Sequence, residues 1–230
     1  ERWTDLWKDV IAPGYINKDR LEAMRMNSRP IEERLIFMHF RGGWNETDDR
    51  YSRSNMSEIR YRLFHNKVLQ HLGDVLIGMP TNTAYLAEAG DSIFCLIPAG
   101  LTAWTVHLYE SFFMGCIPVI LSDHYNLPFE DFIDWPSVSF KIPETYPLEQ
   151  LYDTLQSVPM SVLFEMRKKL DSYACWFDYS RGWDDPSECS PYLGILHGLK
   201  KRADHLKTRT RSSRRNGRSW FGKFRGLKKK

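Results

Sequence analysis

Residues 94–130 read FCLIPAGLTAWTVHLYESFFMGCIPVILSDHYNLPFE and contain the clearest structural pattern in the chain. Two short apolar runs, 93–97 and 117–121, are separated by a helix-length segment, 102–114, that closes at Gly115. Each run ends in small or polar residues, as a strand does before a turn. This succession predicts a βαβ unit, in which loops at the carboxyl ends of the strands line a ligand crevice.

The segments on either side repeat the alternation of strand and helix patterns. Residues 34–40 (RLIFMHF) predict a strand that ends in a tight turn at Arg41, Gly42 and Gly43. Residues 57–72 carry apolar side chains about 3.6 residues apart and predict a helix. Further strands are expected at 74–78 and 138–142, and further helices at 82–89, 148–155 and 161–178. We therefore expect an α/β fold with a Rossmann-like, doubly wound parallel sheet and right-handed crossovers.

The net charge of +3 conceals a strong asymmetry along the chain. Residues 200–230 contain 14 Lys and Arg against one acid, Asp204, while the remainder carries 18 basic and 28 acidic residues. The 42% hydrophobic content excludes wholesale disorder, but from about Thr208 apolar residues become scarce, which predicts a disordered basic tail. Such a tail would contact polyanions, and the alternative is a solvated tail or a retention signal.

The cysteines and sequons bear on the compartment. Cys95 and Cys116 lie in apolar runs and are expected to pack in the core as small hydrophobic residues. Cys175 and Cys189 would close a loop in an oxidising compartment, which the sequence leaves open. Two glycosylation sequons, at Asn45 and Asn55, suggest passage through the secretory pathway.

We expect neither a metal site nor a cofactor. The adjacent acids Asp184 and Asp185 point apart along the chain, and no third ligand stands near them in the sequence. No stretch of the chain reaches the roughly 18 uninterrupted apolar residues of a membrane-spanning helix.

The loops that follow the expected strands contain the candidate binding residues. Ala99 and Gly100 lie between a strand and a helix, where backbone amides favour a phosphate, although a turn glycine is the ordinary alternative. Arg41 and Arg60 are candidate cations for a diphosphate, or else ordinary surface arginines. The pair Ser122 and Asp123 either binds a ligand or merely ends its strand.

The motifs FCLIPAG (94–100), GCIPVILSD (115–123) and LPFE (127–130) resemble the signature of the exostosin-type glycosyltransferases. The resemblance extends over residues 34–170 and includes Arg60, which fits an arginine of an upstream helix. It implies two Rossmann domains (a GT-B fold), inverting transfer from a UDP-sugar to a glycan or polysaccharide, and a Golgi lumenal protein with an N-terminal membrane anchor. This chain would then supply the nucleotide-sugar-binding half at 34–190, after a connector at 1–33 from an absent N-terminal domain and before a basic tail at 191–230.

Within this resemblance, Glu110 matches the acid that accepts hydrogen bonds from the donor ribose, a role that suits an acceptor-only carboxylate. Many members carry arginines facing the donor phosphates where this chain reads Thr105-Val106-His107. His107 would donate to phosphate in their place, with a charge that depends on pH. The general base is expected in the absent half.

The missing phosphate arginine supports a second hypothesis of a different class. A non-catalytic partner subunit, associated with an active paralogous glycosyltransferase, would tolerate this loss. UDP binding by the folded chain distinguishes the two hypotheses.

Overall fold

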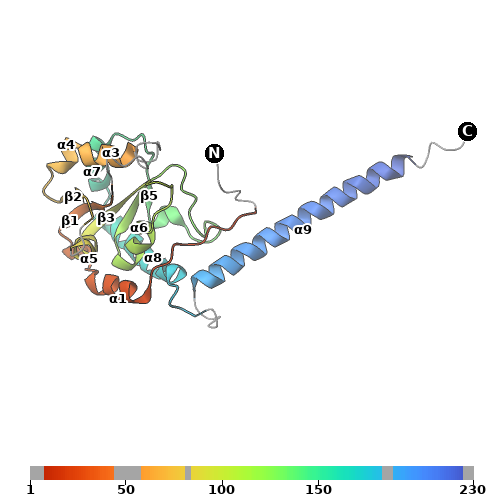
Figure 1. The fold of residues 1–230 in the computed structure, drawn as a ribbon, viewed down its shortest axis with the longest axis horizontal. Helices are drawn as coiled ribbons and strands as arrows, with labels where there is room; N and C mark the ends of the chain where they lie inside the picture. The colour runs from red at the N-terminus through yellow and green to blue at the C-terminus, as the bar shows by residue number, and fades with distance from the viewer. Residues whose placement is uncertain (1–7, 44–57, 81–83, 183–188, 225–230) are drawn as a thin grey trace, which may run out of the picture.

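The computed structural model describes residues 8–43, 58–80, 84–182 and 189–224, with the backbone alone for residues 209–224. Helices cover both faces of a five-stranded parallel sheet, and a long C-terminal helix projects from this body (Figure 1). The strands are β1 Ile36–Arg41, β2 Val75–Gly78, β3 Ser92–Pro98, β4 Ile117–Leu121 and β5 Phe140–Lys141. The predicted parallel α/β fold is confirmed.

The strand order is β2-β1-β3-β4-β5, and every neighbouring pair is parallel. The register places Met38 of β1 beside both Val75 of β2 and Phe94 of β3. The chain leaves β1 in one direction to form β2 and then crosses back to form β3 on the other side. This reversal lies between β1 and β3, the position at which ligands bind in doubly wound sheets.

The helices lie on both faces of the sheet. Because crossover connections are right-handed, a helix covers one face when the chain moves one way along the sheet and the other face when it moves back. One core cluster contains residues of α3 and α4, which follow β1, and of α7; the other contains residues of α1, α5 and α6. The α-helices of the body are α1 Lys18–Asn27, α3 Glu58–His65, α4 Lys67–Gln70, α5 Tyr85–Gly90, α6 His107–Met114, α7 Leu151–Gln156 and α8 Met160–Tyr173. The 3-10 helices are η1 Ile31–Glu33, η3 Trp135–Ser137, η4 Leu148–Gln150 and η5 Ala174–Phe177.

Helix α1 falls within the segment 1–33 that was expected to be a connector. Its Leu21 and Met24 are buried among residues of α5 and α6, so this part of the segment packs with the sheet domain. The domain boundaries themselves stay a prediction.

The expected βαβ unit is present as β3, α6 and β4, but its helix is shorter than predicted. Helix α6 begins at His107 rather than near residue 102. Within the preceding loop, Gly100 N–H donates to the Thr102 carbonyl and Ser122 Oγ donates to the Ala103 carbonyl. These bonds hold the loop in a non-helical path. The helix ends where predicted, because Gly115 adopts a left-handed φ of 60° that glycine tolerates best.

All four cysteines form disulfides, which corrects the expectation for one pair. Cys95 of β3 and Cys116, just before β4, are bonded rather than free, with a Cα–Cα distance of 5.6 Å. The reason is that adjacent parallel strands bring two buried side chains on the same core face within bonding range. Cys175 and Cys189 are also bonded, closing the loop that the sequence left open.

After the body the chain continues as helix α9, Pro191–Phe224. The disorder expected from about Thr208 stays a prediction. Leucine, lysine and arginine between residues 193 and 207 have favourable helix propensities, so local preference supports the first half of α9. In the described part of the chain, no helix combines the length and the apolar character needed to cross a membrane.

Candidate functional site

The carboxyl edge of the sheet brings the predicted binding residues into one region. Strand β1 ends at Arg41, β3 ends at Pro98 just before Ala99 and Gly100, and β4 ends just before Ser122. Helix α6 runs back from the same edge. This convergence follows from the parallel order, because parallel strands all end at one edge.

Glu110 is a buried carboxylate held by two side chains from other helices. Its side chain is 1% exposed. Arg20 of α1 donates to Oε1 from Nε at 2.8 Å and from Nη2 at 2.6 Å, and the Tyr85 hydroxyl donates to Oε2 at 2.5 Å. Burial and then the Glu110 charge raise the pKa of Tyr85 well above its ordinary value, so this hydroxyl keeps its proton. The carboxylate is therefore fixed in position before any ligand binds.

Sequence reasoning missed both partners of Glu110. Arg20 lies 90 residues away in the chain and Tyr85 lies 25 residues away, and only the packing of α1 and α5 against α6 unites them. Nothing in the sequence around either residue signals this contact.

Arg41 forms a bidentate ion pair with Glu88 of α5. Its Nε and Nη2 donate to the two carboxylate oxygens, each at 2.8 Å. The hydrogen bond to Glu88 raises the pKa of Arg41, and the same bond lowers the pKa of Glu88. His39 lies 3.4 Å from Glu88 Oε2, and burial lowers its pKa to about 4. Arg41 thus shares its charge with Glu88, so a diphosphate would have to compete for it.

Arg60 lies beside the topological switch point. Its guanidinium donates to the carbonyls of Ala99 at 3.0 Å and Gly43 at 2.9 Å, and it stacks over the Phe40 ring at 5.5 Å. A Cβ added at Gly100 would lie 2.7 Å from Nη2 of Arg60. Gly100 is therefore needed because a side chain there would clash with Arg60. The sequence predicted a phosphate close to Gly100, but in the structure Arg60 occupies that position.

The amides of the loop after β3 do not form the expected phosphate cradle in this structure. Ala99 N–H donates to the Leu121 carbonyl and Gly100 N–H to the Thr102 carbonyl, both at 3.0 Å. Each amide already has an internal acceptor because the loop folds back on itself and on the end of β4.

His107 opens α6 and is half-buried. Its ring lies 5.8 Å from that of Tyr85 and 6.2 Å from that of Phe40. Burial lowers the pKa of His107. The negative charge of Glu110 raises this pKa, and the positive charges of Arg60 and Arg20 lower it further. At neutral pH the ring is uncharged, so it offers a single hydrogen-bond donor rather than a cation.

The pair Ser122 and Asp123 has structural partners. Buried Ser122 donates from Oγ to the Ala103 carbonyl at 3.0 Å, which anchors the loop before α6. Asp123 and Glu144 exchange bonds, each carboxylate accepting from the other residue's N–H at 2.9 and 3.2 Å. Asn45 and Asn55 lie outside the described residues. Among the residues that are described, no three His, Cys, Asp or Glu side chains cluster as a metal site would require.

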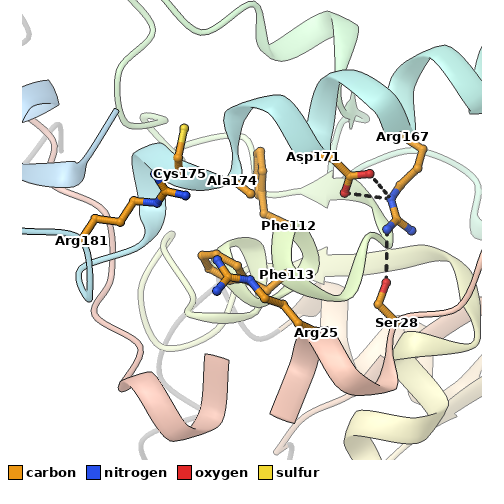
Figure 2. A pocket seen from close by; sticks show the side chains of 9 residues that line it. All are labelled: Arg25, Ser28, Phe112, Phe113, Arg167, Asp171, Ala174, Cys175 and Arg181. Atoms are coloured by element: carbon orange, nitrogen blue, oxygen red, sulfur yellow. Dashed lines mark hydrogen bonds and ion pairs between the residues drawn. The ribbon is translucent and has the colours of Figure 1, made fainter. Parts of the chain in front are cut away.

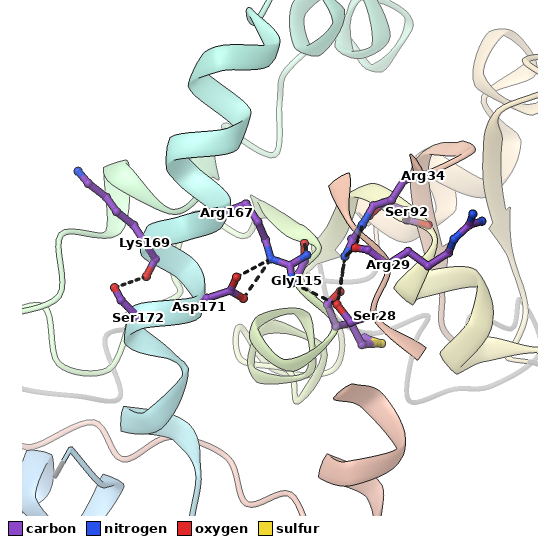
Figure 3. Close-up of polar contacts among 10 residues, drawn as sticks. Ser28, Arg29, Arg34, Ser92, Gly115, Arg167, Lys169, Asp171 and Ser172 are labelled. Atoms are coloured by element: carbon purple, nitrogen blue, oxygen red, sulfur yellow. Dashed lines mark hydrogen bonds and ion pairs between the residues drawn. The ribbon is translucent and has the colours of Figure 1, made fainter. Parts of the chain in front are cut away.

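The amino edge of the sheet contains a second group of arginines, beside a hollow of about 350 Å³ lined by Arg25, Ser28, Phe112, Phe113, Arg167, Asp171, Ala174, Cys175 and Arg181 (Figure 2). Buried Arg34 donates to the carbonyls of Arg29, Ser92 and Met114 (Figure 3). Arg167 donates to the Gly115 carbonyl at 3.0 Å. These guanidiniums tie chain segments together, so the hollow is a less suitable nucleotide site than the carboxyl edge.

Comparisons with known proteins find a matching family and several relatives. The profile of the exostosin GT47 domain matches residues 5–158. In Arabidopsis thaliana, "Probable glucuronoxylan glucuronosyltransferase IRX7" is 29% identical over 71% of this chain and 36% of its own length. Another protein of that plant, "Probable beta-1,4-xylosyltransferase IRX10L", is 32% identical over 80% of this chain and 44% of its own length. "Probable glucuronosyltransferase GUT1" of Oryza sativa subsp. japonica is 30% identical over 70% of this chain and 38% of its own length.

The chain thus spans less than half the length of each of these relatives. The matched region includes β1, β3, α6 and β4, the elements that build the carboxyl edge. The chain belongs to the exostosin GT47 family.

Proposed function

We propose that this chain is the donor-binding half of an inverting glycosyltransferase that transfers a sugar from a UDP-sugar to a glycan or polysaccharide. The observation that supports it most strongly is the buried Glu110 carboxylate at the edge where parallel strands bind ligands. Arg20 and Tyr85 hold this carboxylate in place with three hydrogen bonds, which leaves it room for about one more. Because Glu110 is 1% exposed, a ribose hydroxyl reaches it when a neighbouring side chain such as Tyr85 moves aside.

The diphosphate lies next to the ribose, toward the start of α6. Arg60 and the amino-terminal end of α6 supply positive potential there, and His107 supplies one neutral donor. Arg41 joins them when the ligand phosphate competes with Glu88. Fixed positive groups of this kind stabilise the departing UDP and so lower the barrier to transfer.

The names of the relatives specify glucuronosyl and xylosyl transfer. For this chain we carry over only the class, transfer of a uronosyl, pentosyl or hexosyl residue to a polysaccharide acceptor. We assign neither the acceptor site nor the general base to residues of this chain.

We place the protein on the lumenal side of the Golgi membrane. The two disulfides support this placement, since such bonds persist in oxidising compartments and are rare in the cytosol. The sequons at Asn45 and Asn55 point the same way.

Calorimetric titration with UDP tests the proposal, with GDP as the control nucleotide and EDTA present throughout. The folded chain is expected to bind UDP in preference to GDP, and Glu110→Ala is expected to abolish measurable binding. Asp178→Ala is the matched control, because Asp178 is also a buried acid paired with an arginine of α1, Arg25, at 2.8 Å. Circular dichroism establishes that each variant is folded.

A folded wild-type chain that binds no UDP would contradict donor binding. That result would favour the second candidate, a non-catalytic subunit of an active paralogue. The uncharged His107, in the place of the arginines that face the phosphates in the family resemblance, is the observation that favours it. Retained association with the paralogue would complete that case.

A further inference from the structure

The first turns of helix α9 pack on the body, with two glycines at the closest approaches. A Cβ added at Gly194 would lie 2.5 Å from the Phe129 ring, and one added at Gly198 would lie 2.9 Å from Val10. Farther along, Arg202 pairs with Asp131 at 2.6 Å. Ile195 also packs on the core, and the rings of Tyr192 and His197 contact Tyr179 and Phe132. The contact therefore uses only part of the apolar side chains of the helix.

Three of the larger apolar side chains of α9 lie on a different face, exposed to solvent. Leu196, Leu199 and Leu206 are 59%, 50% and 42% exposed, and exposed Ala203 lies between the last two. Their spacing alternates between three and four residues, which aligns them in one stripe along a helix. We call Leu196, Leu199, Ala203 and Leu206 the leucine stripe. Scattered exposed leucines are common, but an aligned row on a projecting helix indicates a binding surface.

The charges beside the leucine stripe restrict what can cover it. Lys200 and Lys207 lie along one side of the stripe, as the helical spacing dictates, whereas Arg202 faces the body and pairs with Asp131. Residues 200–230 carry 14 Lys and Arg against a single acid. A second copy of α9 would therefore bring two strongly basic helices together, and like charges beside an apolar seam oppose pairing.

An anionic surface with an apolar layer beneath it satisfies both the stripe and the charges. Basic amphipathic helices in which polar residues outnumber apolar ones lie in the plane of a membrane interface rather than across it. No described helix is apolar enough to span a bilayer, which fits this class. The sequence beyond also places Trp220, Phe221 and Phe224 among basic residues, and interfacial amphipathic helices typically combine Trp and Phe with basic residues.

We propose that α9 binds in the plane of an anionic phospholipid membrane, with the leucine stripe in the apolar boundary layer and the lysines and arginines over the lipid phosphates. The helix would thereby hold the sheet domain beside the membrane. This inference rests on α9 alone and stands or falls independently of nucleotide binding.

Vesicle binding by the whole chain tests the proposal. Phosphatidylcholine vesicles containing about 30% phosphatidylserine are expected to bind the chain, and pure phosphatidylcholine vesicles to bind it at least tenfold more weakly. Because insertion buries side chains, lipids brominated in the acyl chains are expected to quench tryptophan fluorescence. Raising the salt concentration to roughly 0.5 M should weaken the interaction without abolishing it, since salt screens only its electrostatic part.

The decisive variant is Leu196→Ser/Leu199→Ser/Leu206→Ser, which removes exposed side chains and so should leave the fold intact. We expect it to bind anionic vesicles at least tenfold more weakly than the wild type. The matched control is Met26→Ser/Leu35→Ser/Val162→Ser, which removes three exposed apolar residues of the body, 80%, 75% and 44% exposed. This control is expected to bind as the wild type does.

Three results would overturn the proposal. If the leucine variant binds vesicles as well as the wild type does, the contact is purely electrostatic. In that case the wild type and the leucine variant would also bind heparin equally well. Equal binding to neutral and anionic vesicles would exclude recognition of charge. Self-association of the wild type that the leucine variant abolishes, seen by sedimentation velocity, would instead assign the stripe to a second copy.

Discussion

Arginines gather at both edges of the sheet, but their partners differ. At the amino edge, Arg34 and Arg167 donate to backbone carbonyls at the end of α6 and at the start of β3. At the carboxyl edge, Arg20 and Arg41 donate to the carboxylates of Glu110 and Glu88. Arg34 and Arg167 thus join segments of the chain, although Arg167 also pairs with Asp171. Arg20 and Arg41 instead fix the positions of acidic side chains, while Arg60 at the same edge donates to the carbonyls of Ala99 and Gly43.

This difference distinguishes a structural use of arginine from a binding use. A carbonyl held by a buried guanidinium is satisfied and has no further task. A carboxylate has room for about four hydrogen bonds, so one that accepts two or three from the protein can still accept from a ligand. We therefore expect substitutions at the amino edge to affect stability, and substitutions at the carboxyl edge to affect nucleotide affinity.

The largest expected effect is on stability, at the amino edge. Arg34→Met should lower the free energy of unfolding by about 3 kcal/mol or more, because it leaves several buried carbonyls without donors. Urea unfolding measures the change. Arg29→Met is the control, since Arg29 is 45% exposed and its surface ion pair with Asp91 contributes at most about 1 kcal/mol.

If fully folded Arg34→Met bound UDP more weakly than the wild type, the amino edge would also affect nucleotide affinity. That result would contradict the proposed division of roles between the two edges. Burial, and then the charge of Arg167, lower the pKa of Arg34 to about 9, so the side chain remains charged at neutral pH and the variant removes a charged donor.

The second effect concerns pH and belongs to the carboxyl edge. Below pH 6.5 the unfolded chain protonates His39, whereas the folded chain does so only near pH 4, so stability falls as pH falls through this window. Between about pH 7.5 and about pH 5 this amounts to roughly 2 kcal/mol. His39→Gln should remove that part of the slope in urea unfolding experiments. Wild-type and variant curves that stay parallel across the window would show that His39 is not the cause.

The smallest expected effect is a difference in UDP affinity between variants of Arg20 and Arg25, two arginines of α1. It tests most sharply the contrast between the two edges of the sheet. Arg20 pairs with buried Glu110, and Arg25 pairs with buried Asp178, and the two arginines are 44% and 48% exposed. Replacing either with alanine should cost similar stability. Only Arg20→Ala should weaken UDP binding, by about tenfold, because a charge-assisted hydrogen bond contributes about 1.5–3 kcal/mol. If Arg20→Ala and Arg25→Ala bind UDP with equal affinity in calorimetry, Glu110 is not part of the binding site.

Most of the fold was predictable from the sequence, but few of the hydrogen bonds and ion pairs of the site were. The βαβ unit around Gly115 follows from local signals, namely apolar runs, helix length and a left-handed glycine. The Cys95–Cys116 bond and the Arg20–Glu110 pair depend instead on which strands and helices become neighbours, and no local pattern encodes that. Gly100 illustrates the same limit, since the sequence indicated a close approach there but not that Arg60 makes it.

Hydrogen exchange with and without UDP tests most directly which edge binds the nucleotide. The account predicts that UDP slows exchange in peptides covering residues 84–88 and 99–110, and that Glu110→Ala abolishes this protection. Peptides covering residues 25–34 and 167–181 should exchange at the same rate with or without UDP. Protection confined to those amino-edge peptides would contradict the account and assign the nucleotide to the hollow beside Arg167.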